Sequence, residues 1–357
     1  MKREKPNYIS LYETLREEII RGVWPFGSRM PSRRVLAVER GLSAVTVEHS
    51  YDILSQEGYI EPRARSGYYV VFRRDDGFAH TTAAETPVKS ASFVPQETSF
   101  PFPTLARTVR KVLSEEGEAL LLRSPSRGVE RLREAISGYL ARNRGMTVTP
   151  DQIVIGSGAE YLYGLVVELL GRERTYAIEA PSYEKIEQVY RSRDVKVEML
   201  PLGSKGIRSD ALAAATASVL HITPYRSFPS GVTADVSKRR EYLRWGEEPG
   251  RFIVEDDFES EFSLLRKHEE TVFSNARSHN VIYLNTFSRT VSPALRAGYM
   301  VLPEQLVPVF AEKLGFYSCT VPTLEQYLLC DLIESGDFER HINRIRRKMR
   351  RTGADPE

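Results

Sequence analysis

Cysteine is scarce in this sequence, and long apolar runs are missing from it. The two cysteines among 357 residues, Cys319 and Cys330, are too few for a disulfide framework, which suits a reducing cytoplasm. No stretch approaches the run of about eighteen apolar residues that a membrane-spanning helix needs. The amino terminus MKREKPNYIS leads into no apolar segment of the kind found in signal peptides. We therefore expect a cytoplasmic protein without a membrane partner.

The sequence also has almost no net charge. Fifty lysines and arginines face 48 aspartates and glutamates, which gives a formal net charge of +2. This balance does not by itself indicate a nucleic-acid-binding protein, so any basic binding surface must be local. A length of 357 residues with 41% hydrophobic side chains predicts two or more domains with cores of their own.

The first seventy or so residues carry the pattern of three short helices followed by a hairpin. Apolar residues recur every four positions after Ser10, which predicts a first helix. Ser32 opens a second helix that ends near Gly41, and Ser43 caps a third. Two short helices joined by a tight turn make a helix-turn-helix. The run YIEPRARSGYYVVF then has two β-rich segments around a basic loop, as expected of a wing hairpin.

Four motifs in this region, MPSRRVLA, LSAVTV, SYDILSQEGYI and SGYYV, resemble in order the winged helix-turn-helix of the GntR family of bacterial regulators. The resemblance covers residues 8–72 and implies binding to a double-stranded DNA operator. The family's operator-contacting arginine is matched by Arg34, whereas Ala44 replaces a second one. The third helix would enter the major groove and the wing would approach the backbone or minor groove. The residues expected at the DNA are Arg33, Arg34, Ser43, Thr46, His49, Ser50, Arg63, Arg65 and Gly67.

Hydrophobic periodicity is lost after Arg73, which predicts a flexible linker over 74–99 between a domain at 1–73 and a second at 100–357. The alternative is that this segment is an irregular edge of the second domain. Beyond it, the strand-like segments QIVIGSG, TYAIEAP, SVLHITP, RFIVEDD and NVIYLNTF alternate with helical stretches. This alternation predicts an α/β fold with a mostly parallel sheet, helices on both faces and ligands at the carboxyl ends of the strands.

These segments resemble the large domain of fold-type I aminotransferases, the enzymes that use pyridoxal phosphate (PLP). Together with the GntR-like head, the chain resembles the MocR group of transcriptional regulators from residue 8 to about 351. Ser157-Gly158-Ala159 opens a helix after a strand, which suits a phosphate, and Arg296 matches the phosphate-binding arginine. Asp256 matches the carboxylate that pairs with the pyridine nitrogen, and Tyr183 the aromatic that stacks on the ring.

One exchange in this site separates an enzyme from a sensor. The family's Schiff-base lysine lies in a Ser-Lys-Thr context, and here the context is Ser288-Arg289-Thr290. A guanidinium stays protonated, so Arg289 cannot be the nucleophile. We expect Arg289 either to recognise a carboxylate or phosphate of a ligand or to neutralise Asp256 or Asp257.

Further departures from the family pattern are Phe258 in place of a tyrosine, Ser227 in place of an amide, Arg123 in place of a tyrosine, and a short carboxyl-terminal subdomain.

We therefore expect a DNA-binding transcriptional regulator whose aminotransferase-like domain serves dimerisation and ligand sensing without Schiff-base catalysis. No cofactor would be bound covalently, although noncovalent PLP or a related phosphorylated ligand could still fit. The expected partners are operator DNA, a second copy of the chain and a small-molecule effector. The alternative is a PLP-dependent aminotransferase fused to a DNA-binding head, against which Arg289 argues. A third possibility is a decaying family member in which only the head functions.

Overall fold

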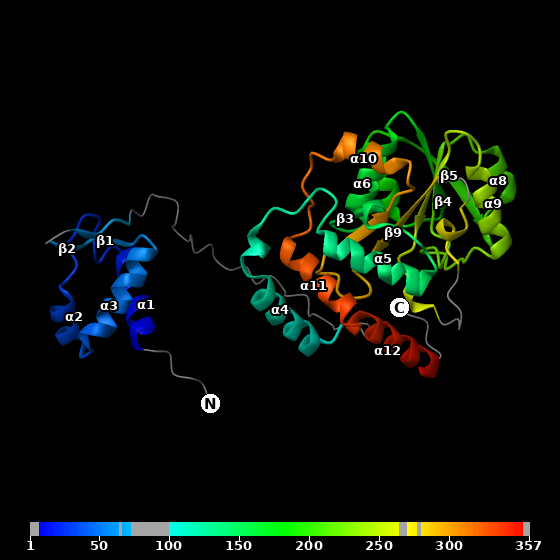
Figure 1. Cartoon of the computed structure of the whole chain (residues 1–357). Helices are drawn as coiled ribbons and strands as arrows, with labels where there is room; N and C mark the ends of the chain where they lie inside the picture. The colour runs from blue at the N-terminus through cyan, green and yellow to red at the C-terminus, as the bar shows by residue number, and fades with distance from the viewer. Residues whose placement is uncertain (1–6, 64–65, 73–99, 264–269, 277–279, 353–357) are drawn as a thin grey trace. The chain divides into compact units, whose positions relative to one another are not determined.

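The computed structural model describes residues 7–63, 66–72, 100–263, 270–276 and 280–352. The chain divides into two compact units, Met1–Phe93 and Val94–Glu357, which Figure 1 colours blue and cyan to red, respectively. The predicted linker at 74–99 lies outside the described residues, as does Arg65 of the predicted wing. No helix in these described ranges is both long and apolar enough to cross a membrane.

The first unit has three helices and a hairpin, as the sequence pattern predicts. Its first helix begins earlier than expected, so Ser10 lies inside it, where its carbonyl accepts a hydrogen bond from the Thr14 hydroxyl at 2.9 Å. The hairpin strands are antiparallel, and Leu15, Val47 and Leu54 are fully buried in the core between the helices. The elements are α1 (Asn7–Ile20), α2 (Arg33–Arg40), α3 (Ala44–Gln56), β1 (Ile60–Arg63) and β2 (Gly67–Val70).

The second unit is built on an eight-stranded sheet with the order β3-β10-β9-β8-β7-β4-β5-β6. The strands from β9 to β5 in this order are parallel, β10 runs antiparallel to β3 and β9, and β6 runs antiparallel to β5. The predicted mostly parallel sheet is therefore confirmed, although the sequence pattern did not identify β5, β6 and β10. The strands are β3 (Ile153–Gly156), β4 (Thr175–Ala180), β5 (Lys196–Gly203), β6 (Gly206–Ile207), β7 (Val219–Ile222), β8 (Phe252–Asp256), β9 (Val281–Thr286) and β10 (Gly298–Val301).

Helices cover both faces of this sheet. One face packs against α6 (Ala159–Leu170), α7 (Glu184–Ser192) and α10 (Leu306–Leu314). The opposite face packs against the remaining helices, α4 (Phe102–Glu116), α5 (Glu130–Arg144), α8 (Ser209–Ala214), α9 (Val236–Gly246), α11 (Thr323–Glu334) and α12 (Asp337–Thr352). Four short 3₁₀ turns also lie in the described part: η1 (Gly117–Leu121), η2 (Pro150–Gln152), η3 (Ser260–Phe262) and η4 (Phe273–Asn275).

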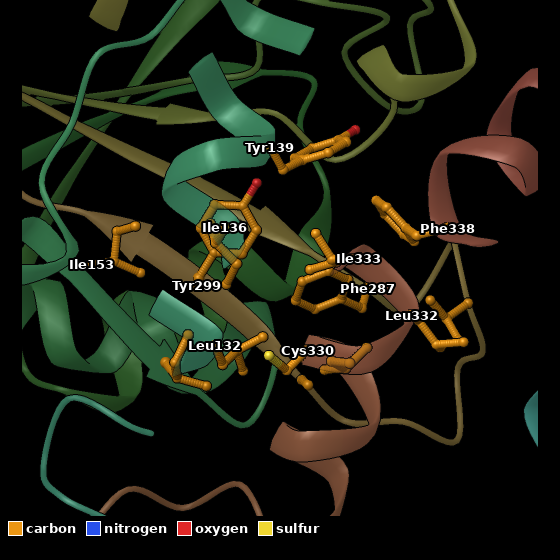
Figure 2. Close-up of a cluster of buried hydrophobic side chains, with 14 of the residues drawn as sticks. Leu132, Ile136, Tyr139, Ile153, Phe287, Tyr299, Cys330, Leu332, Ile333 and Phe338 are labelled. Carbon is orange, nitrogen blue, oxygen red and sulfur yellow. The ribbon is translucent and has the colours of Figure 1, made fainter. Parts of the chain in front are cut away.

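A large apolar cluster supports the side of the sheet that contains β3, β10 and β9. Figure 2 shows Ile136 of α5, Tyr299 of β10 and Ile333 of α11 converging in this cluster. Burying each such side chain stabilises the fold by about 1.5–3 kcal/mol. Cys330 is buried in the same cluster and Cys319 is half-buried, and both are free thiols. The loops at the ends of β3, β9 and β10 therefore start from a rigid support.

Candidate functional site

The amino termini of α2 and α3 are both capped and lie at the surface of the first unit. The hydroxyl of Ser32 accepts a hydrogen bond from the Val35 backbone N–H at 3.3 Å, and that of Ser43 accepts one from the Thr46 N–H at 3.1 Å. Both caps were predicted, because serine before a helix satisfies amide groups that have no partner within the helix. The positive end of each helix dipole suits a DNA phosphate.

The two neighbouring arginines of α2 differ in their surroundings. Arg33 forms an ion pair with Glu48 of α3. Arg34 is exposed, and no ion pair joins it to any residue in the described ranges. Of the two predicted contacts, Arg34 is thus the cation that is available without breaking an existing pair.

The predicted contacts of α3 separate into surface and core residues. Ser43 and His49 are exposed, and the hydroxyls of Ser43 and Thr46 lie 2.8 Å apart. The expectation for Ser50 is wrong. Its side chain is fully buried and donates to the carbonyls of Tyr8 (2.8 Å) and Thr46 (2.9 Å), because Ser50 lies three residues after buried Val47 on the inner face of the helix.

The wing carries one described arginine. Arg63 is exposed at the end of β1, and its guanidinium lies over the Tyr69 ring, 4.4 Å from the ring centroid. Gly67 begins β2 with φ at 100°, a conformation that favours glycine. The ring of Tyr69 thus supports the guanidinium of Arg63.

In the second unit, the strand register gathers the predicted ligand residues at one edge of the sheet, the edge formed by the carboxyl ends of its parallel strands. Gly298 at the start of β10 pairs with Gly156 at the end of β3 and with Thr286 at the end of β9. The segments that carry Arg296, Ser157-Gly158-Ala159 and Ser288-Arg289 therefore leave the sheet at the same edge. This is the edge where ligands bind in open α/β sheets.

Gly158 and Arg296 lie together at the predicted phosphate site, which we call the phosphate cradle. Gly158 precedes α6 with φ at 91° and ψ at 176°, and no side chain caps this helix. A β-carbon at Gly158 would lie 3.1 Å from Nη2 of Arg296. The same Nη2 lies 2.5 Å from Oε2 of Glu160. The other carboxylate oxygen, Oε1, accepts a hydrogen bond from Lys185 at 2.6 Å. The hydrogen bond from Lys185 and the charge of Arg296 lower the pKa of Glu160.

Asp256 ends β8 at the centre of a buried polar chain. One carboxylate oxygen, Oδ2, accepts a hydrogen bond from the Tyr163 hydroxyl of α6 and lies 3.7 Å from Nε2 of His221. Nδ1 of His221 lies 2.7 Å from the Tyr190 hydroxyl. The other oxygen of Asp256 and Nε2 of His221 are buried and hydrogen-bond to nothing in the described part of the chain. Burial and the Asp256 carboxylate raise the pKa of Tyr163 well above its usual value. The unpaired Oδ1 is an acceptor that a ligand nitrogen could satisfy.

Arg289 pairs with a carboxylate that the sequence analysis did not single out. Its guanidinium lies 2.8 Å from Oε1 of Glu259, which is 7% exposed. Neither Asp256 nor Asp257 is its partner, so the expectation that Arg289 neutralises one of them is wrong. The same Glu259 lies 3.4 Å from Nε of Arg226.

The next carboxylate, Asp257, is neutralised from the opposite side of the sheet. Nη2 of Arg144 lies 3.3 Å from Asp257 and 3.2 Å from Glu261, and all three side chains are buried. The Tyr283 hydroxyl also donates to Asp257 at 2.7 Å. This buried pairing locks the loop after β8 onto α5.

The remaining residues that the sequence singled out each have partners or exposure of their own. Tyr183 is 38% exposed, and its ring meets that of Phe228 edge-on with centroids 6.1 Å apart. The Ser227 hydroxyl donates a hydrogen bond to buried Glu179 at 2.5 Å. Burial raises the pKa of Glu179 to about 7, although the hydrogen bond from Ser227 acts to lower it. Phe258 is half-buried, and Arg123 donates to the Ser318 hydroxyl.

Two family models match this chain. Residues 7–70 match bacterial regulatory proteins of the gntR family. Residues 93–352 match aminotransferase class I and II, which is well over half of the chain. The chain belongs to the aminotransferase class I and II family. Ahead of its aminotransferase domain it carries a GntR-type helix-turn-helix domain.

Similar proteins with the same two parts are named as regulators. YdeL of Bacillus subtilis, named as an uncharacterized HTH-type transcriptional regulator, is 28% identical over 98% of this chain and 78% of its own length. The rhizopine catabolism regulatory protein MocR of Rhizobium meliloti, whose name marks that role as probable, is 29% identical over 96% of this chain and 74% of its own. The resemblance to MocR-type regulators is thereby confirmed.

Solved aminotransferases share the fold. An archaeal alanine:glyoxylate aminotransferase aligns with 69% of this chain at a TM-score of 0.62 and 22% identity. The chain spans 63% of that enzyme's length, less than two thirds. At this identity the likeness establishes the fold-type I architecture of the aminotransferase domain and nothing about its activity.

Several residues of the aminotransferase domain site were missed by the sequence analysis. Glu160 could have been found, because it lies two residues after Gly158 in the first turn of the helix that the glycine opens. Tyr163 lies one turn further along the same helix. His221 and Glu259 had no local signal, because their roles depend on contacts between strands far apart in the sequence.

Proposed function

We propose that this chain is a DNA-binding transcriptional regulator whose aminotransferase domain serves as a dimerisation and ligand-sensing unit. The observation that carries this proposal is the match to HTH-type regulators over nearly the whole chain, across both units. The exposed Arg34 and the two capped helix termini supply a DNA-binding face. A ligand that favours one arrangement of the dimer would change operator affinity by population shift.

The proposed DNA binding is tested by measuring the affinity of the chain for the DNA upstream of its own gene at several salt concentrations. We expect salt-sensitive binding, and Arg34→Ala should reduce the slope of log K against log salt by about 0.9 through the loss of one phosphate contact. Arg21→Ala is the matched control, because Arg21 is an exposed arginine at the end of α1 that pairs with Glu17. Salt-independent binding, or an equal effect of both variants, would contradict the proposed DNA face.

The ligand that suits the aminotransferase domain is a phosphorylated, nitrogen-containing ring held without a covalent bond. The uncapped start of α6 and Arg296 fit a phosphate, and the unpaired oxygen of Asp256 fits a protonated ring nitrogen. Tyr183 would lie against the ring. PLP would supply an aldehyde and an electron-withdrawing ring. Arg289 has no free amine to react with that aldehyde, because its side chain is a guanidinium, and this guanidinium is paired with Glu259.

Mass spectrometry tests the covalent step. After PLP and borohydride, peptide mapping of the natural chain should find no addition in the segment that contains Arg289. Arg289→Lys should gain one addition there if this position corresponds to the family's lysine. An addition to the natural chain at a single lysine in this site would favour the second candidate function, a PLP-dependent aminotransferase fused to a DNA-binding head, which the aminotransferase fold and the unpaired Asp256 oxygen also support.

Dimerisation through an apolar surface of the aminotransferase domain would bring two DNA-binding heads to one operator. Leu121 and Leu122 are 86% and 68% exposed, and Phe316 is 73% exposed. The bond from Arg123 to Ser318 holds the two segments that carry them together. We expect a dimer in sedimentation, and Leu121→Glu with Phe316→Glu should yield monomers. A monomeric natural chain would contradict this part of the proposal.

A further inference from the structure

Glu160 holds both cations of the phosphate cradle. Its Oε2 lies 2.5 Å from Nη2 of Arg296, and its Oε1 lies 2.6 Å from Nζ of Lys185. The Arg296 guanidinium is also the group nearest to Gly158, at the open start of α6. A carboxylate of the chain itself therefore already occupies the arginine that a bound anion would need.

We propose that Glu160 is a built-in competitor for anions at the cradle, so that a phosphate group binds by taking Arg296 away from it. This inference rests on the proposed ligand-sensing function and adds the residue that sets the affinity and charge preference of that site. Arg296 and Lys185 together bring two positive charges, and Glu160 removes one of them. A doubly charged phosphate competes with a single carboxylate better than a singly charged anion does.

The exposure of the pair makes this competition reversible. The side chains of Arg296 and Glu160 are 52% and 31% exposed, so water and salt screen their attraction. The buried Arg144 pairs in the same domain could not open at a comparable cost. A ligand arriving at this edge also finds the unpaired Oδ1 of Asp256, which is linked to the same helix through Tyr163. The structure therefore combines a weak ion pair, between Arg296 and Glu160, with a buried acceptor that has no partner, Oδ1 of Asp256.

Calorimetric titration of the full chain with inorganic phosphate, in a low-salt buffer without other multivalent anions, tests the proposal. Glu160→Gln keeps the size of the side chain and removes its charge, and we expect phosphate affinity to rise about two- to fivefold, the range for an exposed ion pair. Glu168→Gln is the matched control, because Glu168 lies near the other end of α6 and also pairs with two cations, Arg172 and Arg193. Its affinity should equal that of the natural chain.

Two results would overturn the proposal: Glu160→Gln binds phosphate no better than the natural chain, or Glu168→Gln gains affinity equally. Arg296→Gln should abolish the gain in a double variant with Glu160→Gln, and a persisting gain would also contradict the competitor role. Melting curves identify any variant that fails to fold. DNA binding separates this test from that of the regulator, because unchanged phosphate affinity with intact operator binding refutes only the role of Glu160. A gain in phosphate affinity without any operator binding refutes only the regulator function.

Discussion

Replacing Glu179 by glutamine should make the stability of the aminotransferase domain less dependent on pH, because it removes one buried group that titrates. Burial raises the pKa of Glu179 from 4.5 to about 7. The folded chain therefore keeps a proton that the unfolded chain releases above pH 4.5, so stability falls as pH rises and the loss is complete once pH exceeds the folded pKa. At about 1.4 kcal/mol per pKa unit, the difference amounts to roughly 3 kcal/mol.

Urea unfolding near pH 5 and pH 7.5 measures this loss. Trp245 lies in the same apolar cluster as Ala177 and Ile222, so its fluorescence reports on this core when Trp24 of the first unit is replaced by phenylalanine. Because pH 5 lies above the unfolded pKa, the chain with Glu179 should lose about 2–2.5 kcal/mol more than Glu179→Gln between the two pH values. Glutamine is nearly isosteric and can still hydrogen-bond the Ser227 hydroxyl.

Two controls decide how the result is interpreted. Burial also raises the pKa of Glu255 to about 7, and since Glu255 is present in both chains its contribution cancels in the comparison. Glu198→Gln, at a half-exposed glutamate on the adjacent strand β5, is the control for the loss of a glutamate that is not buried. If Glu179→Gln shows the same loss of stability with rising pH as the natural chain, the buried carboxyl does not hold the proton and the reasoning fails.

Three further substitutions test other parts of the fold. Arg144→Met leaves Asp257 and Glu261 buried without their cation and should lower the free energy of unfolding by about 3–5 kcal/mol in urea titrations at neutral pH. Gly158→Ala places a β-carbon at a φ of 91° and should cost about 1–3 kcal/mol in the same assay, with weaker phosphate binding by calorimetry. Tyr51→Phe removes the hydroxyl that donates to the Pro31 carbonyl at 2.9 Å and should lower the melting temperature of the isolated first unit, through a loss of about 1 kcal/mol.

The parts of the site that sequence could predict are those set by local chemistry. Ser32 and Ser43 were expected as helix caps, and both accept the backbone bond that a cap requires. Gly158 was expected where a strand turns into a helix, and its positive φ there is one that other residues rarely adopt. Each of these requirements involves only a few consecutive residues, so the residue type reveals it.

The failures concern features that depend on what surrounds a residue in the folded chain. Ser50 was assigned to the DNA from its place in the recognition helix, yet the apolar spacing through Val47 puts it on the inner face. Strand β10, which lies between β3 and β9, was missed because the residues of GYMV are buried on both sides and show no alternation. Glu160 was missed although it lies in the first turn of the helix that Gly158 opens, because its partner Arg296 is 136 residues away in the chain.

The partner of Arg289 follows from strand alternation, which sequence motifs alone did not resolve. Consecutive residues of a strand face opposite sides, so at the end of β8 Asp256 turns toward Tyr163 and Asp257 turns toward Arg144. Both carboxylates are thereby committed to different layers, and Glu259 beyond the strand end is the one that meets Arg289. Because Arg289 does not pair with Asp256, the unpaired Oδ1 of Asp256 stays open to a ligand. Arg289 thus leaves unpaired the carboxylate oxygen that we propose accepts a bond from a ligand ring nitrogen, as the proposed noncovalent sensing requires.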